Sequence, residues 1–394
     1  MIEPQTLRFG PHDLQEVLVW LPEPSTKAET AESRQRSRFW IILIHGGAWR
    51  DPTITHRTFA EPAVSILLSP SPLASPARSI QSDLERRNQS LAIASLSYRL
   101  SSHPSYPETA PITTTTTNTA TTTSSSTSRS TNNNTNATNN PSYFARNARH
   151  PDHLDDICSA LALLHETYGL TEDNYMLVGH SCGATLAFQA LQRLCLSPST
   201  SPSDSLSPSP STQPPSTSTN TSPPPHNKSP LPLPVPPPTA IVGLAGIYNL
   251  RLLLDNHRDT PYSDIYASFL EGAFGTDKND WDRASPARFR STSTSSDESE
   301  SKSNRTSTDR SVNILLVTAD KDDLVEPEQR DVMRRSILGL GTDTEESTES
   351  PHTRSTCRSR YKYKYAEMNV EGGHDDMWRV GERMVQVIER ALEM

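Results

Sequence analysis

The chain has 394 residues, of which 33% are hydrophobic and 6% aromatic, and its formal net charge is −9. These fractions are low for a compact globular protein, and the deficit is concentrated in four stretches rich in Ser, Thr, Pro and Asn. Stretches of that composition bury too little apolar surface to offset the chain entropy lost on folding, so we interpret them as disordered insertions at 111–142, 197–238, 291–310 and 341–358. The remaining residues, roughly 280, have the size of one α/β domain, and we treat 1–394 as a single domain with insertions.

The charge pattern excludes several classes of function. No basic stripe is interleaved with aromatic residues, which argues against nucleic-acid binding. Residues 1–20 are too charged for a secretory signal, and no stretch has the apolar length that spans a bilayer. The four cysteines are Cys158, Cys182, Cys195 and Cys357, and their spacing is neither that of disulfide pairs nor that of metal ligands. We therefore expect reduced thiols in a cytoplasmic protein, and no metal site.

Between the insertions, the apolar pattern alternates between strand and helix. The helix at 153–168 is the clearest, with Asp152 as a candidate N-cap and Gly169 as its C-terminal stop. Repeated alternation is typical of a mainly parallel sheet covered by helices on both faces, an α/β fold. We predict strands at 17–21, 39–44, 91–98, 175–178, 240–244, 312–318 and 365–370. We predict helices at 83–90, 153–168 and 182–196. A further helix ends the sequence, and its apolar stripe consists of Val380, Met384, Val387, Ile388 and Ala391.

The sharpest motif is the G-x-S-x-G sequence at 179–183, which follows an apolar strand and opens a helix. This context is that of a nucleophile elbow, in which Ser181 sits on a tight turn and flanking glycines avoid clashes. The helix N-terminus also directs free N–H groups toward the site. We reject Cys182 as the nucleophile, because the elbow exposes its central residue and should turn Cys182 toward the core.

A second motif, HGGAW at 45–49, directly follows the predicted strand at 39–44. Its small residues allow backbone N–H groups to turn toward the nucleophile. We expect Gly46 and Gly47, together with the N–H of Cys182, to form an oxyanion hole. A glycine-rich turn without a catalytic part is the simpler interpretation of this motif when it is taken alone.

Two further segments supply an acid and a base. Three aspartates follow the strand at 312–318, and we rank Asp322 first as the orienting acid, Asp323 second and Asp320 third. His374 lies between a strand and the last helix, where a loop can carry a general base to the serine; a surface histidine is the alternative. The order serine, acid, histidine is the order of α/β hydrolases.

These motifs together resemble the fungal kynurenine formamidases, arylformamidases of the hormone-sensitive-lipase-like branch of the α/β hydrolases. The tracts at 98–100 (YRL) and 246–250 (GIYNL) are also similar to theirs. The resemblance covers the ordered part of the chain and not the insertions. It rests on HGGAW at 45–49, GHSCGA at 179–184, DKDDLV at 320–325 and GGHDDMW at 372–378.

The resemblance implies a catalytic triad of Ser181, Asp322 and His374 and an HGGxW motif of His45, Gly46, Gly47 and Trp49. It also implies hydrolysis of N-formyl-L-kynurenine to L-kynurenine and formate, a step of tryptophan breakdown toward NAD, by an enzyme that is often a homodimer and needs no cofactor.

The substrate's aromatic ring needs an apolar slot, for which Trp49, Trp378 and the segment 262–274, a possible small cap, are candidates beside their more ordinary role in core packing. Two other functions stay open. One is a general carboxylesterase with the same triad, and the other is a non-catalytic scaffold of hydrolase fold.

Overall fold

The computed structural model describes residues 2–22, 37–69, 75–106, 145–196, 235–288, 311–339 and 362–394. The insertions expected at 111–142, 291–310 and 341–358 lie outside these residues, as does the one at 197–238 except for 235–238. Within the described part of the chain, no helix combines the length and the apolar character needed to cross a membrane.

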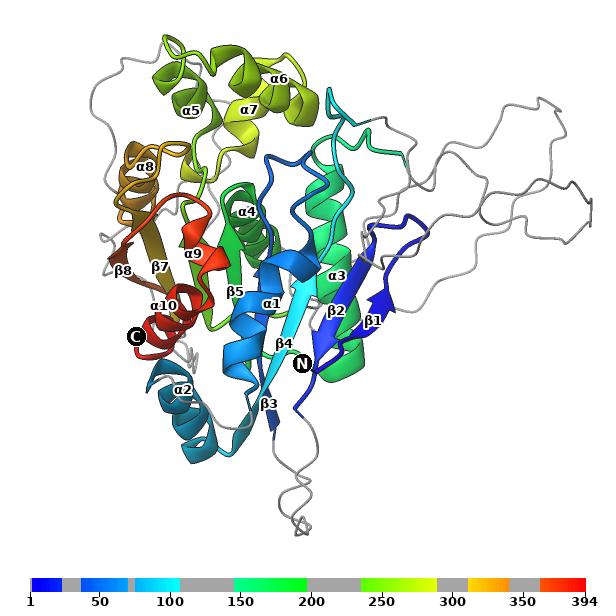
Figure 1. Cartoon of the computed structure of the whole chain (residues 1–394), viewed down its shortest axis with the longest axis vertical. Helices are drawn as coiled ribbons and strands as arrows, with labels where there is room; N and C mark the ends of the chain where they lie inside the picture. The colour runs from blue at the N-terminus through cyan, green and yellow to red at the C-terminus, as the bar shows by residue number, and fades with distance from the viewer. Residues whose placement is uncertain are drawn as a thin grey trace, which may run out of the picture.

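A single sheet of eight strands runs through the described residues in the order β1-β2-β4-β3-β5-β6-β7-β8. The pairs β1–β2 and β2–β4 are antiparallel, and every other neighbouring pair is parallel. Figure 1 shows this sheet crossing the molecule. The strands are β1 (Gln5–Arg8), β2 (Glu16–Trp20), β3 (Ser37–Ile44), β4 (Gln89–Leu96), β5 (Tyr175–His180), β6 (Ala240–Leu244), β7 (Ser311–Ala319) and β8 (Lys362–Val370).

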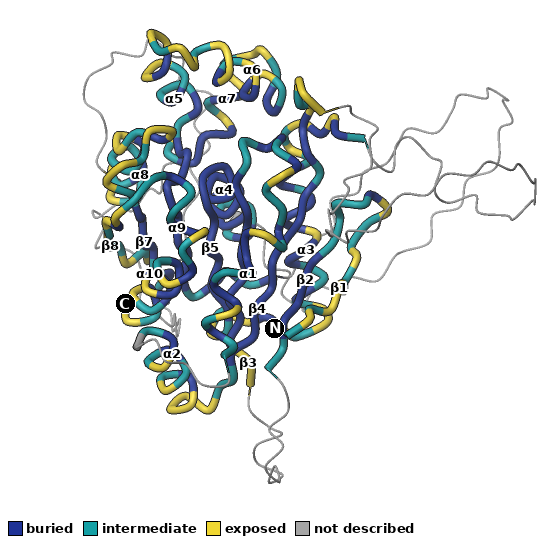
Figure 2. The backbone as a smooth tube through the Cα atoms, viewed as in Figure 1, coloured by how far each residue is buried: buried dark blue, intermediate teal, exposed yellow. Residues whose placement is uncertain are grey.

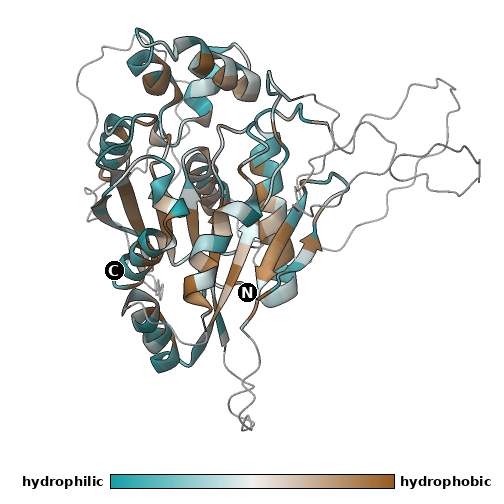
Figure 3. Ribbon diagram, in the orientation of Figure 1, coloured by the Kyte–Doolittle hydropathy of each residue, from teal (hydrophilic) through white to brown (hydrophobic). Residues whose placement is uncertain are grey.

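Alternating side chains of the central strands form two cores, one on each face of the sheet. Trp40, Ile42 and Ile44 of β3 belong to the core on one face, whereas Phe39 and Ile41 belong to the core on the other. Because both faces are covered, the central strands are apolar at nearly every position. Figure 2 shows these strands and α4 as the most buried part of the chain, and Figure 3 shows the hydrophobic residues along the same strands.

Helices cover both faces, and three of them lie at one end of the sheet. Residues of α3 and α4 contribute to the first core, and residues of α1, α2 and α10 to the second. Helices α5, α6 and α7 gather at the top of Figure 1. The helices are α1 (His56–Leu67), α2 (Ser75–Arg86), α3 (Asp152–Tyr168), α4 (Cys182–Leu196), α5 (Leu250–Asn256), α6 (Ser263–Phe274), α7 (Lys278–Ala284), α8 (Glu328–Ile337), α9 (Asp376–Arg379) and α10 (Gly381–Leu392).

All the expected strands are present, and their ends differ from the expectation by no more than three residues. The helix expected at 83–90 is wrong at both ends, since α2 starts at Ser75 and β4 already begins at Gln89. Asp152 is also not an N-cap: it is the first residue of α3, and its carboxylate accepts from the N–H of Arg149 (3.1 Å). Gly169 ends that helix as expected, with a left-handed φ of 68°.

Candidate active site

Ser181 lies on a strained turn between β5 and α4. Its φ of 53° is in the left-handed region, which a residue with a side chain rarely adopts. The Ser181 N–H donates to the carbonyl of Leu244 on the neighbouring strand β6 (2.8 Å), which helps to hold the turn. Strain of this kind costs about 1–3 kcal/mol and is concentrated at functional sites. The local geometry is therefore that of the expected elbow.

The two glycines of the motif are required by packing. A Cβ on Gly179 would lie 2.4 Å from the carbonyl oxygen of Gly183, and a Cβ on Gly183 would lie 2.3 Å from the carbonyl oxygen of Ile44. Both contacts are with backbone, which cannot move aside as a flexible side chain can. The first turn of α4 thus packs directly on β5 and on the end of β3, with Ser181 at the junction.

His374 is hydrogen-bonded to Asp322. The His374 Nδ1–H donates to Asp322 Oδ2 (2.9 Å), and both side chains are buried. The other carboxylate oxygen of Asp322 accepts from the N–H groups of Leu324 (3.0 Å) and Val325 (2.9 Å), which fixes the orientation of the carboxylate. With the proton of the ring on Nδ1, Nε2 is the nitrogen that can accept a proton.

The two competing aspartates occupy different positions. Asp320 Oδ1 accepts from the N–H of Gly372 (2.7 Å), so this residue supports the loop that carries His374 and does not contact the imidazole. Asp323 is exposed. Of the three aspartates ranked from the sequence, the structure brings Asp322 to the histidine.

His180, the residue before the serine, connects the elbow to the histidine loop. Its Nε2–H donates to the carbonyl of His374 (3.1 Å), and the two ring centroids are 4.5 Å apart. Burial, and next the charge of His374, hold the pKa of His180 well below its usual value, so it stays neutral. Sequence reasoning treated His180 only as the variable residue of the motif. The contact places Ser181 and His374 at the same edge of the sheet.

The elbow and the histidine loop meet at His180, which precedes Ser181 in the chain. Within the described residues, no hydrogen bond joins the Ser181 hydroxyl to the imidazole of His374. Nucleophile–base hydrogen bonds are often long in enzymes without substrate and tighten when the substrate binds. The Ser181 side chain is largely buried, with 6% of its surface exposed.

The HGGAW loop lies against the elbow. A Cβ on Gly46 would lie 3.2 Å from Ser181 Cβ, so the Gly46 backbone closely approaches the serine. Gly47 has a φ of 101°, and the N–H of Arg50 closes the turn on its carbonyl (3.0 Å). Among the described residues, the N–H groups of Gly46, Gly47 and Cys182 donate to no backbone carbonyl. This lack of backbone partners is compatible with the oxyanion hole expected from the sequence.

Cys182 points into the core, as expected from the elbow. It is fully buried, and its Sγ accepts from the N–H of Trp49 (3.3 Å) and lies 3.6 Å from the Tyr98 hydroxyl. Burial raises the pKa of Cys182 to about 11, so the thiol stays protonated and unreactive near neutral pH. The sulfur therefore supports the oxyanion loop.

His45 and Trp49 of the HGGAW motif, and Trp378, pack against other buried side chains. The ring of His45 stacks on Tyr98 (centroids 4.4 Å apart), and burial lowers its pKa to about 3. Trp49 is fully buried and meets Phe274 edge-on, so it packs in the core and does not line an open slot. Trp378 is also buried, beside Phe59 and near His180.

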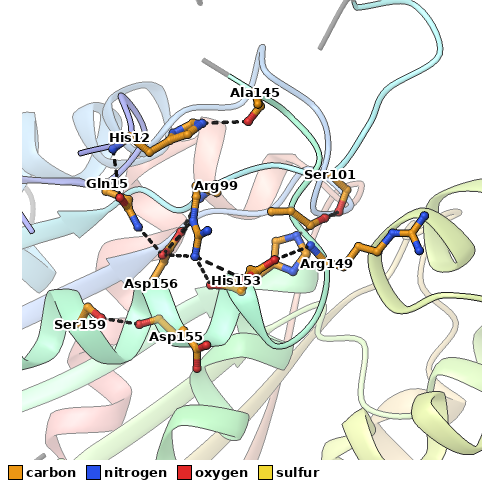
Figure 4. A network of polar contacts seen from close by, with 12 residues as sticks. His12, Gln15, Arg99, Ser101, Ala145, Arg149, His153, Asp155, Asp156 and Ser159 are labelled. Atoms are coloured by element: carbon orange, nitrogen blue, oxygen red, sulfur yellow. Dashed lines mark hydrogen bonds and ion pairs between the residues drawn. The ribbon is translucent and has the colours of Figure 1, made fainter. Parts of the chain in front are cut away.

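A polar network fixes the YRL tract beneath the HGGAW loop. The Tyr98 hydroxyl donates to the carbonyls of His45 (3.1 Å) and Gly46 (3.2 Å). The next residue, Arg99, is held by Asp156 of α3 through its backbone N–H and its guanidinium (2.9 Å each), and Gln15 also donates to this carboxylate (2.8 Å). Figure 4 shows the network from Gln15 to α3.

Replacing Asp156 with alanine is expected to destabilise the protein by about 2–3 kcal/mol, because the half-buried guanidinium and the backbone N–H of Arg99 lose their main partner. The Asp156 side chain is only 2% exposed. Urea denaturation gives the free energy of unfolding. The matched control is Asp155→Ala, since Asp155 pairs with Arg193 at the surface and should contribute less than about 1 kcal/mol. Equal losses in the two variants would contradict the assignment.

Residues of α6 and of the segment after α5 contact the loop that carries Asp322. The Tyr266 hydroxyl of α6 donates to the carbonyl of Leu324 (2.6 Å), two residues after Asp322. The Tyr266 ring stacks on His257 (3.9 Å between centroids), which follows α5 and lies 3.6 Å from the carboxylate of Glu326. The segment expected to form a cap thus coincides with α6 and contacts the loop that positions the acid.

Glu326 should make stability depend on pH. Burial raises its pKa to about 7, above the value near 4.5 of an unfolded chain. A group with a raised pKa in the folded state stabilises fully below the unfolded value, and this contribution is lost as the pH rises through about 7. We expect wild type to lose up to roughly 3 kcal/mol from this source between pH 4.5 and 7.5. Glu326→Gln should show a flatter profile in urea denaturation, and parallel profiles would contradict the prediction.

One group of side chains in the described residues has the spacing of metal ligands. Ligand atoms of His180, His374 and Asp375 lie within 4.8 Å of one another. One nitrogen of each imidazole is engaged, that of His180 with the carbonyl of His374 and that of His374 with Asp322, whereas His180 Nδ1 has no partner among the described residues. The second nitrogen of His374 is the one that can take part in proton transfer.

The mainly parallel sheet, the elbow after β5, and the acid and histidine loops after β7 and β8 define an α/β-hydrolase fold. A solved bifunctional GH43-CE protein of Bacteroides eggerthii superposes with a TM-score of 0.50 at 11% identity, covering 98% of this chain and 34% of that one. Esterase B from Lactobacillus Rhamnosis gives a TM-score of 0.48 at 12% identity, covering 100% of this chain and 84% of that one. No family model matches the sequence.

Curated relatives confirm the resemblance to fungal kynurenine formamidases. The chain is 29% identical over 370 residues to kynurenine formamidase avaC of Aspergillus versicolor, covering 90% of this chain and 88% of that one. It is 26% identical to the kynurenine formamidase-like hydrolase fscH of Fusarium equiseti, covering 95% and 88%. A kynurenine formamidase of Meyerozyma guilliermondii is 25% identical, covering 84% and 80%. The chain is a hydrolase that resembles this group.

Proposed function

We propose that this protein is a serine hydrolase that cleaves the formamide of N-formyl-L-kynurenine, releasing L-kynurenine and formate. The observation that carries the proposal is the buried His374–Asp322 pair at the edge of the sheet where Ser181 occupies the elbow. The names of the relatives support the substrate. The place of this step in tryptophan breakdown toward NAD, and a homodimeric state, remain part of the proposal.

The first half of the reaction acylates the serine. His374 Nε2 takes the proton of the Ser181 hydroxyl as its oxygen attacks the formyl carbon, and Asp322 stabilises the resulting imidazolium. The oxyanion is held by the free N–H groups of Gly46, Gly47 and Cys182. His374 then gives its proton to the departing nitrogen, and the C–N bond breaks.

The second half releases formate. Water enters, His374 removes its proton, and the hydroxide attacks the formyl–enzyme at the same carbon. The tetrahedral intermediate collapses and returns the proton from His374 to Ser181. An aryl amine is a better leaving group than an alkyl amine because its lone pair is delocalised into the ring. The proposed cycle uses side chains and water alone and needs no cofactor.

Substrate preference tests the proposal against a general carboxylesterase. The values of kcat/KM for N-formyl-L-kynurenine and for p-nitrophenyl acetate are compared on the same preparation. We expect efficient formamidase turnover. A strong ester preference with negligible formamidase activity would favour the carboxylesterase instead. Labelling by a fluorophosphonate separates both enzymes from a non-catalytic scaffold, which would not react at Ser181.

A further inference from the structure

A cavity of about 510 Å³ opens between the loop after β4 and the cap helix α6. Residues 102–106 line one side of it, and Ser268 and Gly272 of α6 line the other. Its lining includes the hydroxyls of serines and the imidazole of His103, so it is suited to a polar group.

The cavity adjoins the HGGAW loop. The N–H of Ser101, next to the first lining residue, donates to the carbonyl of Trp49 (2.8 Å). The following residue, Arg50, is tied by its own N–H to the carbonyl of Gly47 (3.0 Å). The loop that lines the cavity is thus hydrogen-bonded to the loop that follows β3 and approaches Ser181.

The guanidinium of Arg50 lies directly behind Ser268, one of the residues that line the cavity. Its Nη1 donates to Ser268 Oγ (2.9 Å), and its guanidinium carbon lies 5.7 Å from the ring centroid of Phe269. Arg50 is 8% exposed, and no carboxylate of the described residues lies within salt-bridge distance of it. The adjacent Asp51 instead directs its carboxylate to the backbone N–H and hydroxyl of Thr53 (2.8 and 2.7 Å).

Burial lowers the pKa of Arg50, and the charge of the adjacent Asp51 offsets this only in part, so a further anion within hydrogen-bond reach would stabilise the guanidinium. Arg50 has five N–H donors, and the Ser268 hydroxyl accounts for one of them. Burial, and next the charge of Arg50, lowers the pKa of His103; the charge of Asp51 opposes this shift, and that of Arg146 adds to it. The cavity thus combines space, hydroxyl groups and positive charge.

We propose that Arg50 and Ser268 bind the carboxylate of the substrate's amino-acid end in this cavity. The inference rests on the proposed formamidase function and adds to it a selection rule, namely that aryl formamides with a carboxylate at the far end are preferred over neutral ones. Arg50 suits this role because its planar fork of donors matches the two oxygens of a carboxylate. The Ser268 hydroxyl, which accepts from Arg50, keeps its own proton to donate.

The test compares two formamides that differ at the far end alone. N-formyl-L-kynurenine carries the amino-acid group, and 2′-formamidoacetophenone has the same formanilide and ketone without it. For Arg50→Gln we expect kcat/KM on N-formyl-L-kynurenine to fall about ten- to a hundredfold, chiefly through KM, because a charge-assisted contact is lost. The fall on the neutral compound should be much smaller, so the ratio of the two values collapses.

A matched control is Arg57→Gln, which removes a surface arginine of α1 that pairs with Glu61. It should preserve the ratio of wild type, and Arg50→Lys should restore part of it by keeping the charge. If Arg50→Gln leaves the ratio of the two kcat/KM values unchanged, the subsite is overturned. An equal fall on both formamides would then indicate a purely structural role for Arg50. If wild type cleaves p-nitrophenyl acetate but neither formamide, the proposed function fails and the subsite falls with it.

Discussion

Replacing Ser181 with alanine is expected to lower kcat for N-formyl-L-kynurenine by about 10⁵- to 10⁶-fold, leaving the residual catalysis of the oxyanion donors and of substrate binding. The variant keeps the fold, because alanine removes only the hydroxyl from a turn held by backbone contacts with Leu244. KM should change little, since the hydroxyl contributes mainly to the transition state. Steady-state kinetics, with protein prepared free of wild type, measure this loss.

A serine far from the site controls for nonspecific effects. Ser159 of α3 is exposed, and its hydroxyl donates to the carbonyl of Asp155 (2.7 Å). Ser159→Ala should retain wild-type kcat and KM. Activity in Ser181→Ala within tenfold of wild type would remove this serine from the mechanism, whatever the geometry of its turn.

Replacing Asp322 with asparagine is expected to lower kcat by about 10³- to 10⁴-fold. The asparagine can keep the backbone contacts with Leu324 and Val325, so the loop should hold its shape. An amide cannot stabilise the imidazolium, and it can donate to Nδ1 and so place the His374 proton on the wrong nitrogen. The loss should therefore appear in kcat with little change in the free energy of unfolding.

The neighbouring aspartates provide a comparison within the same loop. Asp323→Asn alters an exposed side chain and should keep wild-type activity. Asp320→Asn weakens the contact with the N–H of Gly372, so it should cost less than tenfold by loosening the histidine loop. A larger loss in Asp323→Asn or Asp320→Asn than in Asp322→Asn would reassign the orienting acid.

The core of the sheet was predictable because its signal is local. The central strands are continuous apolar runs, and the G-x-S-x-G motif marks the junction of β5 and α4, so the helix at 182–196 was predicted with both ends correct. Helix α1 was not predicted, although Phe59, Ala63 and Leu67 recur at helical spacing on its buried face. Pro62 lies in the interior of α1, and a proline at an interior position usually argues against a helix.

The choice among the three aspartates required the structure. Asp320, Asp322 and Asp323 share one acidic loop, and spacing along the chain ranks them without deciding which carboxylate faces the histidine. Long-range contacts decide it: the pair with His374 joins residues 52 positions apart. The contacts of Arg99 with Asp156 and of Tyr266 with Leu324 are equally remote in sequence, so no local pattern could have shown them.

The most direct measurement is a crystal structure of the protein after reaction with an aryl phosphonate. We expect phosphorus bonded to Ser181 Oγ, the phosphoryl oxygen about 3 Å from the N–H groups of Gly46 or Gly47 and of Cys182, and His374 Nε2 within hydrogen-bond distance of the adduct. An adduct on another residue, or on Ser181 with its phosphoryl oxygen turned away from these amides and His374 out of reach, would contradict the account.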